Sequence, residues 1–125
     1  MKRKWAPQAA LSGAMAFSVE AYINSNQAEA GQEAWDQWQA KYPAEFLQGY
    51  GVVLETRLMV LRKEPDAAAR LAEAFAQAIP TSSYAPQLLD RASRLLGKSN
   101  PEKSKALRDL LKQRYPEDPL SQDKP

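Results

Sequence analysis

The chain has 125 residues, a formal net charge of +2, and neither histidine nor cysteine. This length suits one domain with its own apolar core. The absence of histidine and cysteine removes the commonest general base, the thiol nucleophiles and the commonest metal ligands, so we expect no enzyme, no metal and no cofactor. Helix-favouring residues dominate and Val52–Val53 is the only β-branched pair, which predicts an all-α fold.

The first 17 residues, MKRKWAPQAALSGAMAF, combine basic residues with an apolar stretch, as a secretory signal does. Pro7, Gln8, Ser12 and Gly13 interrupt that stretch, and no run in the chain approaches the ~20 apolar residues of a spanning helix. We therefore favour a cytoplasmic location. A periplasmic or exported location would follow if this segment were a signal or an anchor.

Prolines recur at nearly even intervals along the chain. Pro43, Pro80 and Pro116 are separated by 37 and 36 residues, and a further step of 36 back from Pro43 reaches Pro7. Proline ends a helix because it lacks a backbone N–H and clashes with the preceding turn. The interval suits a hairpin of two helices, so we predict three units, at 7–43, 44–80 and 81–116.

Within each unit the pattern predicts two helices, six in all, near 8–23, 27–42, 44–63, 66–79, 84–97 and 101–115. The residues five places before each closing proline are large and apolar (Trp38, Phe75 and Leu111) and belong to the core. Residues 44–63 are apolar nearly all round, which predicts a helix buried on several sides. The tail 117–125 is polar and is expected to be flexible.

Two segments resemble the joins between successive units of tetratricopeptide-like repeat proteins. They are LAEAFAQAIPTSSYAP, at Leu71–Pro86, and ALRDLLKQRYPEDP, at Ala106–Pro119. Gly51 is similar in place to the small residue that this family carries in its first helix. The resemblance implies three helical hairpins in a short right-handed solenoid whose concave surface binds a protein or peptide.

Charge is unevenly distributed along the sequence. Six acidic residues and one basic residue lie between Ser18 and Glu55, whereas eight basic and two acidic residues, Arg108 among the basic ones, lie between Arg91 and Arg114. The basic segment is either a docking surface for an acidic partner or an ordinary solvated helix face. Aromatic residues are not interleaved with the basic ones beyond Tyr115, which argues against nucleic acid.

Arg57 and Arg94 occupy equivalent places, 14 residues after Pro43 and Pro80. In a solenoid such positions form a row, so Arg57 and Arg94, with Arg91 and Tyr84 nearby, could hold a carboxylate of a partner. The alternative is ordinary ion pairing within the chain, to Glu55 or Asp90.

Trp35 departs from the repeat, since its counterparts are Ala72 and Arg108. It either covers the first helix around Met15 and Val19 or is an exposed interface residue. The function that these features predict is a protein–protein interaction scaffold, adaptor or assembly factor. Its partner would be a protein or peptide of acidic character, with a membrane surface less favoured and a small-molecule substrate not expected. The alternative is a permanent accessory subunit of a larger complex.

Overall fold

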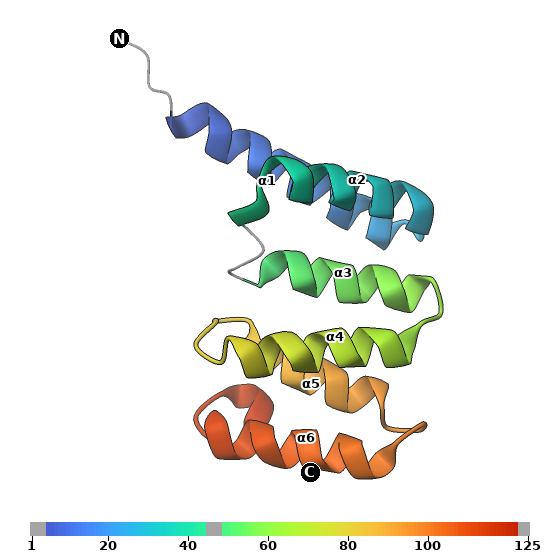
Figure 1. The fold of residues 1–125 in the computed structure, drawn as a ribbon, viewed down its shortest axis with the longest axis vertical. Helices are drawn as coiled ribbons and strands as arrows, with labels where there is room; N and C mark the ends of the chain where they lie inside the picture. Colours follow the sequence, from blue (N-terminus) through green and yellow to red (C-terminus); the bar gives the residue numbers. More distant parts are fainter. Residues whose placement is uncertain (1–4, 45–48, 123–125) are drawn as a thin grey trace.

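The computed structural model describes the backbone of residues 5–44 and 49–122, and the side chains of 11–44 and 49–122. Six α-helices occupy these ranges (Figure 1): α1 Trp5–Asn24, α2 Ala28–Lys41, α3 Tyr50–Leu61, α4 Pro65–Ala78, α5 Ala85–Leu95 and α6 Pro101–Arg114. A 3₁₀ helix, η2, follows at Pro119–Ser121. The described ranges contain no strand, which confirms the all-α class.

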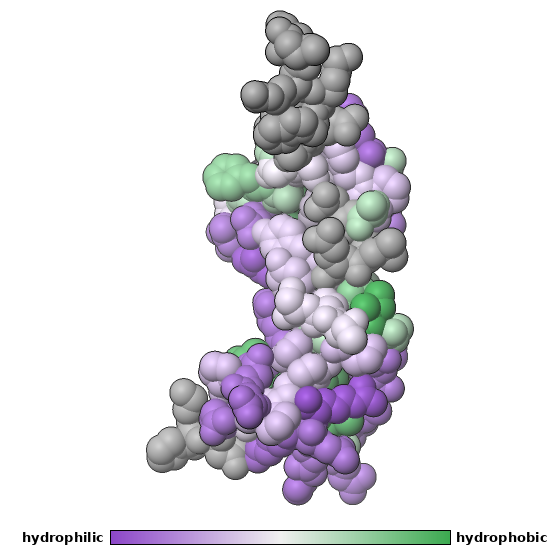
Figure 2. All heavy atoms as spheres, turned by 90° about the vertical axis from the view of Figure 1, so that its left-hand side faces the viewer, coloured by the Kyte–Doolittle hydropathy of each residue, from purple (hydrophilic) through white to green (hydrophobic). Residues whose placement is uncertain are grey.

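The helices run back and forth and stack along the long axis of the molecule (Figure 1). Each helix packs against the next one in the chain, and α1 also packs against α3. The α3–α4 pair separates α1 and α2 from α5 and α6, and α1 and α5 lie behind their neighbours in this view. Figure 2 shows the molecule narrowing about half-way along its length, with the hollow on the side turned away from the viewer in Figure 1.

The three closing prolines follow the same backbone structure. The residue before each one, Tyr42, Ile79 or Tyr115, has φ of −132°, −130° or −130° and ψ of 63°, 69° or 59°. Its backbone N–H still donates to the carbonyl four residues earlier, on Trp38, Phe75 or Leu111. Proline excludes the helical conformation from the residue before it, so the same sequence signal ends α2, α4 and α6 in the same way.

A second recurrent turn ends α1 and α3. Asn26 and Lys63 have φ of 61° and 64°. After α3, the Lys63 N–H donates to Val60 O at 2.9 Å and the Glu64 N–H donates to Met59 O at 2.9 Å, and the turn after α1 has the same two bonds. This is the Schellman arrangement, which satisfies the last carbonyls of a helix at the expense of one left-handed residue.

We expect Lys63→Gly to stabilise the protein by about 0.5–1 kcal/mol, because glycine adopts positive φ without the clash that a side chain meets there. Lys98→Gly is the matched control, since Lys98 is an exposed turn residue without positive φ. The control should not increase the free energy of unfolding. Urea unfolding measures this free energy for both variants, and an equal change in the two would show that Lys63 is not strained.

Two apolar cores meet at α3. Leu54 and Leu58 belong to a cluster with α1 and α2, and Val52 and Val53 belong to a cluster with α4, α5 and α6. All four side chains are at most 9 % exposed. The prediction that this helix is buried on several sides is therefore confirmed, and the lack of a polar face in its sequence has this physical cause.

The start of α3 and the end of the chain differ from the sequence-based expectation. Gly49 has φ of 106° and precedes the first residue of α3, so the helix does not run unbroken from residue 44; Phe46 and Leu47 lie outside the described residues. The tail was expected to be flexible from 117, but Ser121 is 5 % exposed and Leu120 packs against the core. Residues 123–125 also lie outside the described ranges.

Candidate functional site

Two arginines come together on the α3 and α5 side of the molecule. Arg57 on α3 donates to Asn24 Oδ1 of α1 at 2.8 Å, a neutral acceptor. Arg91 on α5 is partly buried, and its Nε is shielded from solvent without a hydrogen-bond partner. Burial lowers the pKa of Arg91, the nearby charge of Arg57 lowers it further, and Asp90 opposes both. The charge of Arg57 thus acts on Arg91, and among the described residues no acidic group is bonded to either arginine.

The sequence placed Arg57 and Arg94 in one row, with Arg91 nearby; in the structure the charge of Arg57 acts on Arg91. Helix α3 begins seven residues after Pro43, whereas α5 begins five residues after Pro80. The starts of the two helices are therefore 35 residues apart, whereas the two prolines are 37 residues apart. Counting from the prolines and counting from the helix starts therefore give different pairs of positions.

A pocket of about 210 Å³ adjoins this pair and is lined by Gln87, Asp90, Arg91, Arg94 and Leu95. Arg94 is 70 % exposed and its Nε lies 2.9 Å from Asp90 Oδ2. The ion pairing weighed from the sequence is thus present at Arg94, whereas Arg57 and Arg91 have no ion pair among the described residues. Asp90 is the single acidic residue of the lining, so the pocket and its margin carry excess positive charge.

Arg108, predicted as a binding residue, forms contacts within the fold. Its guanidinium donates to Asp90 Oδ1 of α5 at 2.8 Å and to the carbonyl of Leu120 in η2 at 3.1 Å. The side chain is 26 % exposed, and Asp90 is buried. Arg108 therefore links α5, α6 and η2, which also explains why the segment after Pro116 is ordered against the helices.

Arg108→Ala should destabilise the protein by about 1–3 kcal/mol, because it removes a partner from a buried carboxylate and releases η2. Arg94→Ala should cost only about 0–1 kcal/mol, since the same carboxylate is met there by a mostly exposed side chain. The free energies of unfolding in urea compare the two. If Arg94→Ala were the more destabilising of the pair, the division of roles would be wrong.

Tyr84 precedes α5 and its ring lies 5.8 Å from that of Tyr50, the first residue of α3. The Tyr50 hydroxyl donates to the Glu20 carboxylate of α1. Burial, followed by this bond, raises the pKa of Tyr50. These contacts join Glu20 of α1, Tyr50 at the start of α3 and Tyr84, the residue that caps the start of α5. Arg57 and Arg91 lie further along α3 and α5.

Trp35 is buried, with 6 % of its surface exposed, and packs in the cluster that contains Val19 and Met15. Its indole N–H donates to the carbonyl of Gly51 at 2.9 Å. Of the two interpretations of Trp35, the structure supports the one in which it covers the first helix. The bond to Gly51 adds a contact to α3 that the sequence pattern did not indicate.

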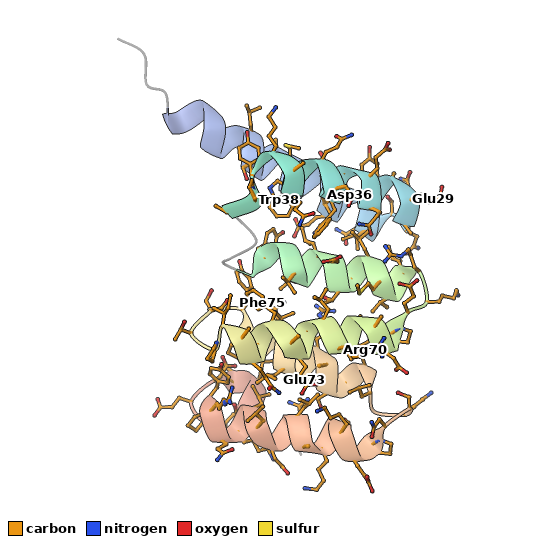
Figure 3. The ribbon with its side chains drawn as sticks, in the orientation of Figure 1. Glu29, Asp36, Trp38, Arg70, Glu73 and Phe75 are labelled. Carbon is orange, nitrogen blue, oxygen red and sulfur yellow. The ribbon has the colours of Figure 1, made fainter. Side chains whose placement is uncertain are left out.

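A larger hollow, which the sequence analysis did not single out as a binding site, lies between α2 and α3. It has a volume of about 580 Å³ and carries Glu29, Glu33 and Asp36 of α2 opposite Glu55 of α3 and Arg62, the residue after that helix. Figure 3 shows Glu29 and Asp36 on the same helix. Among the described residues, no group of three acidic side chains is arranged to hold a metal ion. Helical spacing of the acids was visible in the sequence, but Glu55 reaches them only through the fold.

Burial raises the pKa of Glu55, with Arg62 opposing the shift and Asp36 adding to it. A carboxyl with a raised pKa in the folded state stabilises the protein below its unfolded pKa, and that stability is lost as pH rises through the folded value. Glu55→Gln should therefore raise the melting temperature at pH 7, with the gain fading below about pH 4, near the ordinary pKa of glutamate. Thermal melts across this range test it, and a gain independent of pH would contradict the assignment.

Comparison of the chain with protein-family models, with curated proteins and with solved structures finds no significant match. No helix among the described residues has both the length and the apolar character needed to cross a membrane.

Proposed function

We propose that the protein is an interaction scaffold that binds an acidic segment of a partner protein on the surface formed by α3 and α5. The observation that carries this proposal is the Arg57–Arg91 pair. Like charges repel at short distance, and a buried guanidinium nitrogen without a partner costs free energy. A carboxylate between the two arginines would remove both penalties at once, with the planar geometry that arginine offers to carboxylates.

The arrangement around the pair suits a peptide better than a small molecule. The 210 Å³ pocket is below the usual range for small-molecule sites, about 300–1,000 Å³. Tyr50 and Tyr84 continue the surface along α3 and α5 and offer aromatic area beside the charges. An extended acidic segment could therefore contact the arginines with one side chain and the tyrosines with the next.

We also propose that the three hairpins form a short right-handed, tetratricopeptide-like solenoid whose first helices α1, α3 and α5 line the binding side. The recurrent turns before Pro43, Pro80 and Pro116 support a repeated unit. The hollow outline in Figure 2 lies on the side toward which α1 and α5 are placed, which suits a concave wall. The role proposed here is binding, in keeping with a chain that lacks histidine and cysteine.

An acetylated oligo-glutamate peptide should bind at low salt and perturb the Nε–Hε NMR signal of Arg91. Affinity should fall steeply toward physiological salt, because exposed charges are screened over about 10 Å at 0.1 M. The double variant Arg57→Gln with Arg91→Gln should lose at least about tenfold in affinity, as expected when two charge-assisted bonds are removed.

The control is Arg70→Gln combined with Arg114→Gln, which removes the same charge from exposed positions on α4 and α6. That variant should bind nearly as well as the unchanged protein. Equal losses in the two double variants would show that only net charge matters. Unchanged binding in both would place the acidic peptide elsewhere on the molecule.

A further inference from the structure

The hollow between α2 and α3 carries negative charge that its own lining does not neutralise. Among the described residues, the lining contains Glu29, Glu33 and Asp36 of α2 and Glu55 of α3, against one basic residue, Arg62. The ion pairs found within the described ranges include none of these four acidic residues. A cationic surface placed against this side of the molecule would therefore be attracted to it.

The three acidic residues of α2 form one exposed stripe. Glu29, Glu33 and Asp36 follow one another at spacings of four and three residues, which places them on the same side of the helix, and all three are exposed. At 1.5 Å per residue the stripe is about 10 Å long. Figure 3 shows Glu29 and Asp36 along α2. The chain thus carries an acidic segment of the kind that the Arg57–Arg91 surface is proposed to bind.

This acidic stripe and the arginines lie on different sides of the molecule. Glu55 and Arg57 are two places apart on α3, and such positions point to nearly opposite sides of a helix. Glu55 lines the hollow toward α2, whereas Arg57 donates to Asn24 of α1. Figure 1 agrees with this, since α2 lies in front of α1 and α5 lies behind α4. The two surfaces therefore do not meet within one copy of the chain.

We propose that the Arg57–Arg91 surface binds α2 of a second copy, so that copies of the chain associate head to tail. This inference rests on the proposed function of that surface and names its partner. Arg91 and Arg94 are one turn apart on α5, which matches the spacing of the acidic stripe. The shielded Arg91 Nε, which has no hydrogen-bond partner among the described residues, would gain a carboxylate.

The contact joins two different surfaces, and this determines how far association proceeds. Each added copy leaves one arginine surface and one acidic stripe free at the ends of the assembly. Association therefore continues beyond two copies, unlike a contact in which both copies use the same surface.

Sedimentation velocity of the full chain tests this proposal. At about 0.1 M salt the average sedimentation coefficient should rise with protein concentration, and at about 1 M salt it should not, because the charges are then screened. The acidic variant, Glu29→Gln with Glu33→Gln and Asp36→Asn, should weaken association at least about tenfold. The arginine variant, Arg57→Gln with Arg91→Gln, should weaken it as much, since it removes the other side of the same contact.

A mixture of the two variants gives the sharpest result. The acidic variant keeps its arginine surface, and the arginine variant keeps its acidic stripe. An equimolar mixture should therefore form pairs that contain one copy of each and stop at two copies. Pairing would also show that both variants are folded.

The matched control is Glu102→Gln with Asp109→Asn and Glu117→Gln. It removes three exposed acidic residues on α6 and directly after it, and it has the same net charge as the acidic variant. At about 0.1 M salt it should associate within about threefold of the unchanged protein, because charges far from the contact are screened over about 10 Å.

Three results would overturn the proposal. The first is a sedimentation coefficient that does not depend on concentration at about 0.1 M salt. The second is an equal loss in the acidic variant and its control, which would show that net charge alone matters. The third is a mixture of the two variants that does not pair.

The oligo-glutamate peptide separates this inference from the proposed function. The acidic variant should bind the peptide at least as tightly as the unchanged protein does, because its arginine surface is intact. Peptide binding that depends on Arg57 and Arg91, in a chain that stays monomeric, would support the peptide surface and reject α2 as its partner. Peptide binding that is unchanged in the arginine variant would reject the proposed function itself.

Discussion

The attachment of the first hairpin to the rest of the molecule depends on how closely α2 approaches α3 at Gly31. A methyl group at this position would lie 2.8 Å from Leu58 Cδ2 and 3.4 Å from Tyr22 Cβ. Leu58 is fully buried and has little room to move. Because the helices are this close, the Trp35 indole reaches the Gly51 carbonyl on α3, while the Trp38 indole donates to Ser12 of α1 at 3.1 Å. One glycine therefore allows α2 to bind two helices at once.

At the α5–α6 end of the molecule, the buried carboxylate of Asp90 joins neighbouring helices. Asp90 accepts from Arg94 and from Arg108, and Arg108 extends the connection to η2. Close packing of α5 and α6 is completed by Ser93 and Ser104, whose hydroxyls each donate to the other residue's carbonyl, at 2.9 Å and 2.7 Å. Both oxygens of Asp90 are engaged by these partners, and its hydrogen bonds come from Arg94 and Arg108. The charge of Asp90 still acts on the neighbouring Arg91, whose pKa it raises against the effect of burial.

The two ends of the molecule have different surfaces for a physical reason that the cores make clear. Over residues 11–24, where its side chains are described, α1 buries four residues and carries a single charged one, so its outer side there is apolar, small or uncharged. Helix α6 buries only Leu107 and Leu111 and fills the rest of its surface with charged and polar residues. If both terminal helices served only to shield the apolar core from water, both would have a polar outer face.

The sequence by itself determined the helices and their stops. These signals are local, and each acts over a few residues or one helix. They are the proline that follows a helix, Asn100 as the cap of α6, and the apolar sequence of α3. The sequence does not indicate which small residues lie at the close helix contacts: Gly31 and Ala68 are buried, whereas Ala30 and Ala67, one place earlier, are only partly buried.

Only the tertiary structure decided which charges meet. The register between helices decides these contacts. It places Arg91 within the influence of the Arg57 charge, Arg108 against Asp90, and Glu55 opposite the acidic residues of α2. That register is set by loop length and by the depth to which side chains interdigitate. Neither quantity has a period in the sequence, because each results from contacts between residues that are far apart along the chain.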